Sequence, residues 1–566
     1  TTIEKIPITK NGKLDRNSLP DIETPIMNTF VEPGNEKEAK ILEIFRNVLG
    51  YELLGITDDF FEYGGDSIKS MMFVAKCKEI GYEITSKEIV SNPTVEAIAS
   101  LCRELSGETG ENEDVKGPVK ATPIYEYFKE MKLPNETHYN QAVLLQGMKP
   151  VQTEWVEQAM GHLVEHHDVL RAKWADGSLR IQEKDRAHEF VDVTTVSING
   201  TKNMEQACNE VQKSISFEHG SLCKAVILST GDGDYLLFVA HHLVIDGVSW
   251  RILLDDFVQL YEECSKGIEL QLPAKTTSVQ TWAEALEQYA NSSGFTVENQ
   301  YWNTWLEQFE TENHRKVLHG TDGVTQHRIL LDKREMNELL LACREVYGMD
   351  ANVVYMTAFM VALCDLTKRK RIMVSLEGHG REVIQEGNSL DRTVGWFTSI
   401  FPVVLDLKDT IQNTMVHVKD TVKMASLYQL GYGIKKYILH EKMNDFVPDV
   451  MFNYLGDVGA TLKENEFFAL SDLDLGEMCA KENKDESLLT INGFTKADSV
   501  LFELEYGNAQ YSKSDIEKLE KNVMDVLEQM KTLCFGKHEK VITVSDVSTE
   551  QIAEDEWDEL CAMYNA

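Results

Sequence analysis

Polar side chains with acid–base character follow three apolar, strand-like runs of the chain. The three junctions are residues 235–240 followed by His241 and His242, residues 371–376 followed by Glu377, and residues 450–452 followed by Asn453 and Tyr454. An imidazole, a carboxylate and a phenol can each remove or return a proton. Strand ends and loops on a rigid scaffold commonly hold such groups. The pattern indicates a proton-transfer site if the three strand ends meet in space.

A serine at a helix start is the second feature that suggests chemistry. In residues 58–77, DDFFEYGGDSIKSMMFVAKC, Gly64 and Gly65 permit a tight turn. Asp66 and Ser67 then stand where side-chain oxygens satisfy free helix N–H groups. Capping alone would explain a lone serine. It does not explain the apolar residues on both sides of the turn, which are Phe60, Phe61, Ile68, Met71 and Met72.

Apolar periodicity predicts the elements that position these groups. The predicted helices are residues 35–49, 67–80, 95–105, 153–166, 203–216, 249–263, 333–347 and 515–532. Residues 107–118, GETGENEDVKGP, have the composition of a linker. We therefore divide the chain into a tail and linker (1–34), a helical unit (35–106), a linker (107–118), a two-lobed mixed region (119–545) and a C-terminal tail (546–566).

Composition excludes several classes of protein. The 566 residues carry a formal net charge of -37, which disfavours binding to nucleic acid. No apolar run reaches the roughly 18 residues of a membrane span, and no signal peptide opens the sequence. The ten cysteines are scattered singly, which favours reduced thiols in a cytoplasmic protein and no metal site.

The residues around Ser67 match the pattern D-x-F-F-E-x-G-G-x-S and resemble the peptidyl carrier domains of nonribosomal peptide synthetases. The resemblance covers residues 35–106. It implies a four-helix bundle with 4'-phosphopantetheine attached covalently to Ser67. The thiol of this group would hold a substrate as a thioester, at high effective concentration near neighbouring sites. Asp66, where many carriers have histidine, resembles carriers that serve an epimerization domain.

Seven later segments resemble, in order, the motifs of an epimerization domain, a branch of the condensation domains. They are ATPIYEYF (121–128), HHDVLR (166–171), HHLVIDGVSWR (241–251), EGHGRE (377–382), RTVGWFTSIFP (392–402), YQLGYGIKKY (428–437) and FNYLG (452–456). The resemblance implies a two-lobed α/β fold like that of chloramphenicol acetyltransferase. It also implies an isomerase that inverts the α-carbon of an aminoacyl or peptidyl thioester, with no cofactor besides phosphopantetheine.

The resemblance also implies residue roles. His242 and Glu377 are expected to act as acid and base on opposite faces of the α-carbon, and the sequence leaves open which acts on which face. Asn453 and Tyr454 are expected to line the site and to stabilise the oxygen that develops negative charge. Four further residues are expected to support the structure, with Asp246 paired to Arg171 because a buried charge needs a partner. These four are Asp246, Arg171, His241 and Arg381.

The chain ends suggest neighbours in a longer assembly. Residues 5–16, KIPITKNGKLDR, resemble the last motif of an adenylation domain, and the acidic C-terminal tail is a candidate docking segment. The expected partners are an upstream adenylation domain, a phosphopantetheinyl transferase, a downstream condensation domain and the carrier-bound substrate, with neither nucleic acid nor a membrane.

Two other functions remain open at this point. A condensation domain would form an amide bond between two carrier-bound substrates, and it shares the motif HHxxxDG. A catalytically inactive docking platform would lack the acid and base, which His242 and Glu377 provide here. The segments EGHGRE, FNYLG and GGDS favour epimerization.

Overall fold

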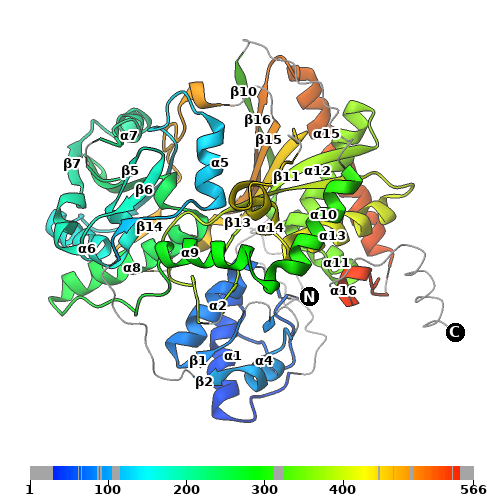
Figure 1. Ribbon diagram of the computed structural model, residues 1–566, viewed down its shortest axis with the longest axis horizontal. Coiled ribbons are helices and arrows are strands. Elements are labelled where there is room, and N and C mark those ends of the chain that lie inside the picture. Colours follow the sequence, from blue (N-terminus) through cyan, green and yellow to red (C-terminus); the bar gives the residue numbers. More distant parts are fainter. Residues whose placement is uncertain are drawn as a thin grey trace, which may run out of the picture. The chain divides into compact units, whose positions relative to one another are not determined.

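The computed structural model of the chain describes residues 30–547, except for 62, 66, 86–87, 90–91, 105–114, 219, 310–322, 386, 444–445, 463–464, 485–488 and 538 (Figure 1). The chain divides into two compact units, Thr1–Ser106 and Gly107–Ala566. The motif at residues 5–16, Asp66 and nearly all of the C-terminal tail lie outside the described residues.

The first unit is helical, and two of its helices match the predicted positions closely. Its elements are α1 (Glu36–Leu49), α2 (Ser67–Glu79), β1 (Tyr82–Glu83), α4 (Val95–Leu101) and β2 (Arg103–Glu104). Asn35 caps α1, because its side-chain oxygen accepts a hydrogen bond from the amide of Glu38 at 2.9 Å. The helix predicted over 95–105 is shorter, because Arg103 and Glu104 pair with β1 instead.

The second unit contains two large mixed sheets, each with its own hydrophobic core. The sheet of the first lobe has the strand order β14-β4-β9-β8-β7. These strands are β4 (Asn140–Gly147), β7 (Val193–Ser197), β8 (Cys223–Thr230), β9 (Gly233–His241) and β14 (Phe468–Leu470). A smaller sheet consists of β3 (Gly117–Pro118), β5 (Ala172–Ala175) and β6 (Ser178–Ile181).

The first lobe has five α-helices among its described residues, which are α5 (Pro123–Met131), α6 (Thr153–His166), α7 (Met204–Gln212), α8 (Gly247–Lys266) and α9 (Val279–Ala290). Three of them, α6, α7 and α8, lie at the predicted positions, and two, α5 and α9, were not predicted. The bounds of α6 are those predicted. Helix α8 is longer than predicted at both ends, because the side chain of Asp246 caps its start and Gly267 adopts a left-handed conformation at its end.

The second lobe is built on a sheet with the strand order β10-β16-β15-β13-β11-β12. These strands are β10 (Val324–Asp332), β11 (Arg371–Gly378), β12 (Ser399–Asp406), β13 (Val450–Asp457), β15 (Leu489–Lys496) and β16 (Ser499–Gly507). The helices are α10 (Thr296–Phe309), α11 (Lys333–Tyr347), α12 (Ala351–Thr367), α13 (Ile411–Leu427), α14 (Gly431–Gly433), α15 (Lys513–Phe535) and α16 (Val544–Val547). Among the described residues no single helix could cross a membrane, and the bent pair α11–α12 qualifies only by length and composition.

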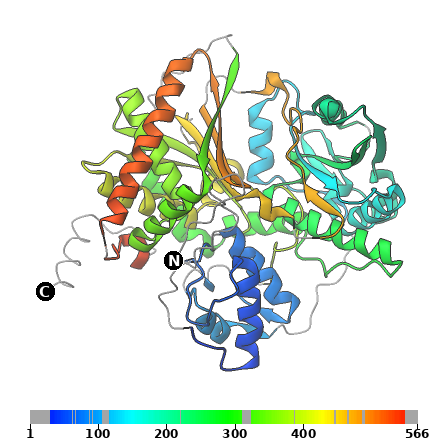
Figure 2. The same ribbon diagram turned by 180° about the vertical axis from the view of Figure 1, so that it is seen from behind.

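Two segments of the second half of the chain pack into the first lobe. The connection between β11 and β12 contributes Leu390, Val394, Trp396 and Phe397 to the core of the first lobe. Strand β14 pairs with β4 and extends the first sheet. The two lobes lie side by side in both ribbon views (Figures 1 and 2). These two segments join the lobes, and they therefore fix the polar ends of β9 and β11 relative to each other.

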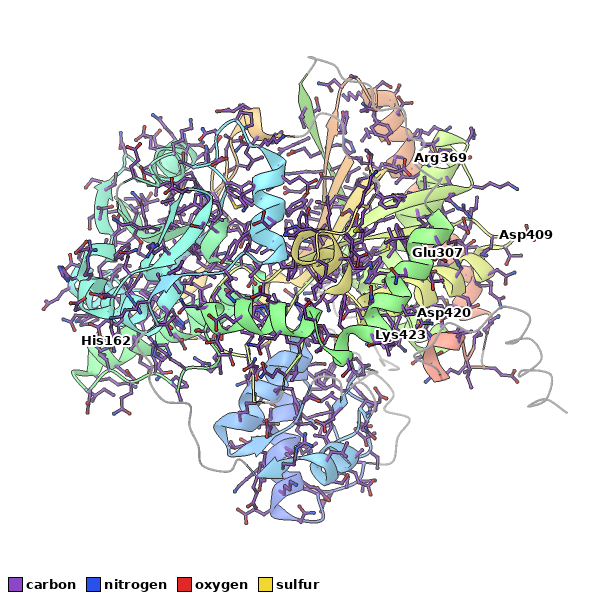
Figure 3. The ribbon with its side chains drawn as sticks, viewed as in Figure 1. His162, Glu307, Arg369, Asp409, Asp420 and Lys423 are labelled. Carbon is purple, nitrogen blue, oxygen red and sulfur yellow. The ribbon has the colours of Figure 1, made fainter. Side chains whose placement is uncertain are left out.

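The end of the described chain docks onto α13, where Asp420 and Lys423 are labelled in Figure 3. Lys419, which is almost fully buried, pairs with Asp546 at 2.6 Å. Thr543 donates a hydrogen bond to Asp420 at 2.6 Å. The start of the predicted C-terminal tail is therefore held on the second lobe, on the helix that follows β12.

Candidate active site

His242 follows the last residue of β9 and begins a short 3-10 turn, His242–Val244. Its amide donates to the carbonyl of Tyr139 at 2.9 Å. The centroid of its ring lies 4.3 Å from that of Trp396 and 5.5 Å from that of Tyr139. Burial lowers the pKa of His242 from its ordinary 6.5. The imidazole is therefore neutral at pH 7 and able to accept a proton.

The neighbouring His241 has a different environment. It is fully buried, and its Nε2 donates to the carbonyl of Glu136 at 2.8 Å. Its Nδ1 accepts from the amide of Leu243 at 3.2 Å. Burial lowers the pKa of His241 to about 3. With both nitrogens engaged and no charge at pH 7, His241 supports the turn that presents His242.

Two residues that the sequence reasoning missed also contact His242. Tyr139 stacks on its ring, with the two planes 21° apart. Gln141 approaches it, with 2.9 Å between the two Nε2 atoms. Both stand at the start of β4, which runs antiparallel to β9 with Asn140 opposite His241. The available signal was the polar pair Asn140–Gln141 at the start of an otherwise apolar strand.

Glu377 lies near the end of β11, and the sheet register places it beside Asn453. Strands β11 and β13 are parallel, with Leu376 next to Phe452. The following residues, Glu377 and Asn453, therefore share the opposite face of the sheet. Asn453 donates from Nδ2 to Oε2 of Glu377 at 3.2 Å. This contact joins two of the three predicted strand ends.

The surroundings of Glu377 shift its protonation equilibrium. Its side chain is exposed to solvent by surface area, yet the surrounding protein raises its pKa to about 7. The protein around Glu377 therefore favours its protonated form. At pH 7 such a group is divided between its protonated and ionised forms, so it can donate or accept a proton.

Tyr139 is linked to both His242 and Glu377, by a ring contact to the first and by an electrostatic effect of the second. Tyr139 contacts His242 directly, as described above. Burial raises the pKa of Tyr139 well above 10, and the charges of Tyr127 and Glu377 raise it further. An electrostatic effect of this kind requires proximity. Glu377 of the second lobe therefore lies within electrostatic range of Tyr139, and the ring of Tyr139 stacks on His242.

Tyr454 does not share the face of Asn453, which corrects the prediction that both residues line the site. Consecutive residues of a strand point to opposite faces of the sheet. The ring of Tyr454 lies 5.0 Å from that of Tyr355 in α12, and its hydroxyl is 2.7 Å from the hydroxyl of Thr495. Tyr454 thus packs against the core of the second lobe.

The predicted pair Asp246–Arg171 is also wrong. Arg381 is the partner of Asp246, with Nη2 at 2.9 and 3.1 Å from its two carboxylate oxygens. Arg171 is fully buried and binds Asp168 at 2.8 Å. It also donates to the carbonyl of Val164 at 2.8 Å. The donors of Arg171 bind the end of α6, Asp168 and the carbonyl of Gln182, so this arginine anchors the turn after α6 to its neighbours.

Asp246 links the histidine motif to the connection between β11 and β12. It caps α8 through the amide of Ser249 at 2.7 Å and accepts from the amide of Phe397 at 3.1 Å. The hydroxyl of Ser249 donates to the carbonyl of Gly395 at 2.8 Å. These contacts hold Trp396 against His242 and leave Asp246 without access to a substrate. Asp246 and Arg381 therefore have a supporting position.

A small, mainly apolar pocket of about 30 Å³, partly open to solvent, adjoins Trp396. Its lining includes Thr122, Tyr127, Trp282, Trp396, Phe397 and Tyr437. Within the described part of the chain, the buried Thr122 Oγ1 and Trp396 Nε1 have no hydrogen-bond partner. A pocket of about 30 Å³ has room for roughly one or two waters, which could bind these two groups.

In the first unit, Ser67 is the first residue of α2 and follows a turn that requires glycine. Gly64 has a φ of 88°. A Cβ atom at Gly65 would lie 2.2 Å from the ring of Phe60. This close packing brings the chain sharply into α2 and sets Ser67 at its N-terminus. A serine in this position suits the attachment of a phosphate group, which the helix N-terminus favours electrostatically.

Comparison with known proteins identifies the class. The family model of the condensation domain matches residues 117–553, and that of the phosphopantetheine attachment site matches residues 39–102. The chain therefore belongs to the condensation-domain family, joined to a carrier domain that bears covalently attached 4'-phosphopantetheine. The predicted fold class, a helical carrier followed by an α/β domain like chloramphenicol acetyltransferase, is confirmed.

The relatives are nonribosomal peptide synthetases. Surfactin synthase subunit 1 of Bacillus subtilis (strain 168) is 32% identical over 100% of this chain, which covers 16% of that protein. Gramicidin S synthase 1 of Brevibacillus brevis is 31% identical over 99% of this chain and 53% of its own length. The chain thus spans only part of the length of these proteins.

Solved structures share the fold of the second unit. The epimerization domain from the third module of tyrocidine synthetase B aligns with a TM-score of 0.69 and 29% identity, covering 76% of this chain and 100% of that one. The first condensation domain of the calcium-dependent antibiotic synthetase aligns with a TM-score of 0.57 and 14% identity, covering 77% and 99%. The second match shows the fold alone.

Proposed function

We propose that this chain epimerizes the α-carbon of an aminoacyl or peptidyl thioester carried on its own phosphopantetheine, attached at Ser67. The observation that supports this most is that Asn453 binds Glu377 at the ends of two adjacent strands, while His242 stacks on Tyr139, whose pKa Glu377 helps to raise. Inverting a carbon centre requires a proton acceptor on one face and a donor on the other. The similarity to the tyrocidine synthetase epimerization domain also favours this reaction.

We propose the following roles for conversion in the L-to-D direction. His242 is neutral, so it accepts the α-proton at its ring nitrogen. Glu377 below pH 7 carries a proton, which it delivers to the opposite face of the carbon. The C–H bond broken at His242 is replaced by a C–H bond formed from Glu377, so that imidazolium and carboxylate remain and exchange protons with solvent. Asn453 orients Glu377 by donating to one of its oxygens.

Phosphopantetheine supplies a flexible arm whose thiol holds the substrate as a thioester, and the thioester carbonyl acidifies the α-proton. The first unit fits this group, because Ser67 opens α2 after the close turn at Gly65. We also propose the partners that such a segment requires, which are an upstream adenylation domain, a phosphopantetheinyl transferase and a downstream condensation domain.

Amide-bond formation is the second candidate. The condensation family model matches the whole second unit, and the motif HHxxxDG at residues 241–247 belongs equally to that reaction. The two candidates differ in what happens to the α-hydrogen. Epimerization must exchange it, whereas amide formation need not.

The decisive experiment loads an L-aminoacyl-pantetheine onto Ser67 in deuterium oxide. We expect a mixture of D and L residues with deuterium at the α-carbon, measured by chiral chromatography and mass spectrometry of the released amino acid. Ser67→Ala should block loading. An amide product from a second carrier-bound acceptor, with no α-deuterium, would instead favour condensation.

Replacement of His242 tests the proposed base. His242→Ala should lower α-exchange about 10² to 10⁴-fold while loading continues. The matched control is His162→Ala, because His162 is an exposed histidine on α6 (Figure 3). Exchange at the normal rate in His242→Ala would contradict the assignment.

A further inference from the structure

The side chain of Gln141 connects the indole of Trp250 to the imidazole of His242. The indole Nε1 of Trp250 donates to Oε1 of Gln141 at 2.9 Å. On its other side, Nε2 of Gln141 lies 2.9 Å from Nε2 of His242. Gln141 and Trp250 belong to different elements, β4 and α8, and His242 lies in the turn between β9 and α8. Three separate segments therefore meet in one hydrogen-bonded row.

This row determines the direction of each hydrogen bond. An indole N–H is only a donor, so the atom of Gln141 that faces Trp250 must be the carbonyl oxygen. The amide NH2 of Gln141 then faces His242, and an NH2 group is also only a donor. Nε2 of His242 must therefore be the acceptor, with its lone pair toward Gln141. The ring hydrogen is consequently on Nδ1.

The other groups near His242 do not oppose this state. Among the described residues, Nδ1 of His242 is buried and has no partner within hydrogen-bonding distance. The main-chain groups of His242 and Ile245 nevertheless raise the pKa of the ring, so they favour a proton on it. Of the titratable groups nearby, Asp246 is paired with Arg381, and His241 is neutral. Tyr139 is neutral, and beyond it lies Glu377.

We propose that Gln141, fixed by Trp250, is a positioning residue that holds His242 as the neutral Nδ1–H tautomer, so that Nε2 carries the lone pair that accepts the α-proton. The proposal rests on the proposed function and extends it. The amide NH2 of Gln141 would clash with a hydrogen on Nε2. The amide therefore also disfavours protonation of Nε2 before the substrate arrives. As the substrate arrives, the amide must move aside and leave the lone pair to the α-hydrogen.

Gln141→Glu replaces the hydrogen-bond donor that faces Nε2 of His242 with an acceptor of about the same size. A carboxylate still accepts from Trp250, but it now accepts from Nε2–H of His242 as well, which favours the imidazolium. A neighbouring opposite charge raises the pKa of a histidine by about one to three units. The matched control is Gln146→Glu, because Gln146 is an exposed residue of the same strand and receives the same charge.

The first measurement is independent of activity. In the full chain labelled with 15N-histidine, the ring nitrogens of His242 are assigned by their absence in His242→Ala and followed over pH 5–9. We expect wild type and Gln146→Glu to show a neutral ring with hydrogen on Nδ1 at pH 7. In Gln141→Glu the ring should remain protonated to a pH at least one unit higher. An Nε2–H tautomer in wild type, or an unmoved titration in Gln141→Glu, would overturn the proposal.

The second measurement is the pH profile of L-to-D conversion in the same three proteins. Gln141→Glu should move the acidic limb, where His242 loses its proton, upward by one unit or more. The limb near pH 7 that belongs to Glu377 should stay in place. If wild type shows the Nδ1–H tautomer but catalyses no α-exchange, the proposed function fails while the positioning of His242 stands. If wild type exchanges and the acidic limb of Gln141→Glu is unmoved, the positioning role fails.

Discussion

At the scale of single residues, the site depends on two titratable groups whose environments shift them in opposite senses. Burial lowers the pKa of His242 and raises that of Glu377 to about 7. Each shift favours the uncharged form, because a charge is poorly solvated inside protein. An uncharged base and an uncharged acid are the pair that proton removal and return require. His241, adjacent in sequence, has no such role because both of its nitrogens are engaged.

The pH dependence of epimerization follows from these shifts. Glu377 is protonated below pH 7, so L-to-D conversion should fall as the pH rises through about 7. His242 is neutral at and above pH 7, because burial lowers its pKa from 6.5. Stopped assays of the D/L ratio from pH 5.5 to 9 would measure this limb. A rate that rises through pH 7 would assign the base role to Glu377 instead.

Replacement of Glu377 separates the two proton transfers. Glu377→Gln should lower L-to-D conversion about 10² to 10⁴-fold, since an amide does not protonate carbon readily. Deuterium should still enter the L residue through His242, with retention of configuration. Glu307→Gln is the control, because Glu307 is exposed on α10 (Figure 3). Loss of all deuterium uptake in Glu377→Gln would show that His242 does not remove the proton.

At the scale of elements, alternation along β13 decides which polar residue reaches the site. Asn453 shares a face with Glu377, whereas Tyr454 faces α12 and the core. The two residues are neighbours in sequence, yet the period of a strand separates their side chains across the sheet. A motif of adjacent polar residues therefore contributes one of them to the site and the other to packing.

Two variants test this separation. Asn453→Ala removes a donor that favours the ionised form of Glu377, so the limb near pH 7 should move upward. Tyr454→Phe removes the contact to Thr495, so the free energy of unfolding should fall by about 1 kcal/mol with the limb unmoved. The pH profile and urea denaturation provide the two readouts. If Tyr454→Phe moves the limb of the pH profile near pH 7 and Asn453→Ala does not, then Tyr454 and not Asn453 acts on Glu377.

At the scale of the whole molecule, the buried pair Asp246–Arg381 holds the two lobes in register. It joins the histidine motif to the connection between β11 and β12, and that connection presses Trp396 against His242. Both side chains are almost fully buried. The loss of one partner would leave an uncompensated charge in the protein interior.

Arg381→Met should therefore destabilise the second unit by about 3–5 kcal/mol. Arg328→Met is the control, because Arg328 pairs with Glu503 on the surface at 2.8 Å and such pairs contribute at most about 1 kcal/mol. Urea denaturation followed by tryptophan fluorescence would measure both. Equal effects of the two substitutions would show that the Asp246–Arg381 pair is not a structural link.

The sequence alone determined many of the helices and strands, and the strand ends and helix start that carry the candidate functional residues. The helices at 153–166 and 333–347, the strands that end near His242 and Glu377, and the turn before Ser67 all follow from local periodicity and from glycine. Only the tertiary structure decided the partners. Arg381 meets Asp246 across 135 residues of chain, and Gln141 meets His242 across 101. Such contacts depend on sheet register and on the crossing between lobes, which local patterns do not encode.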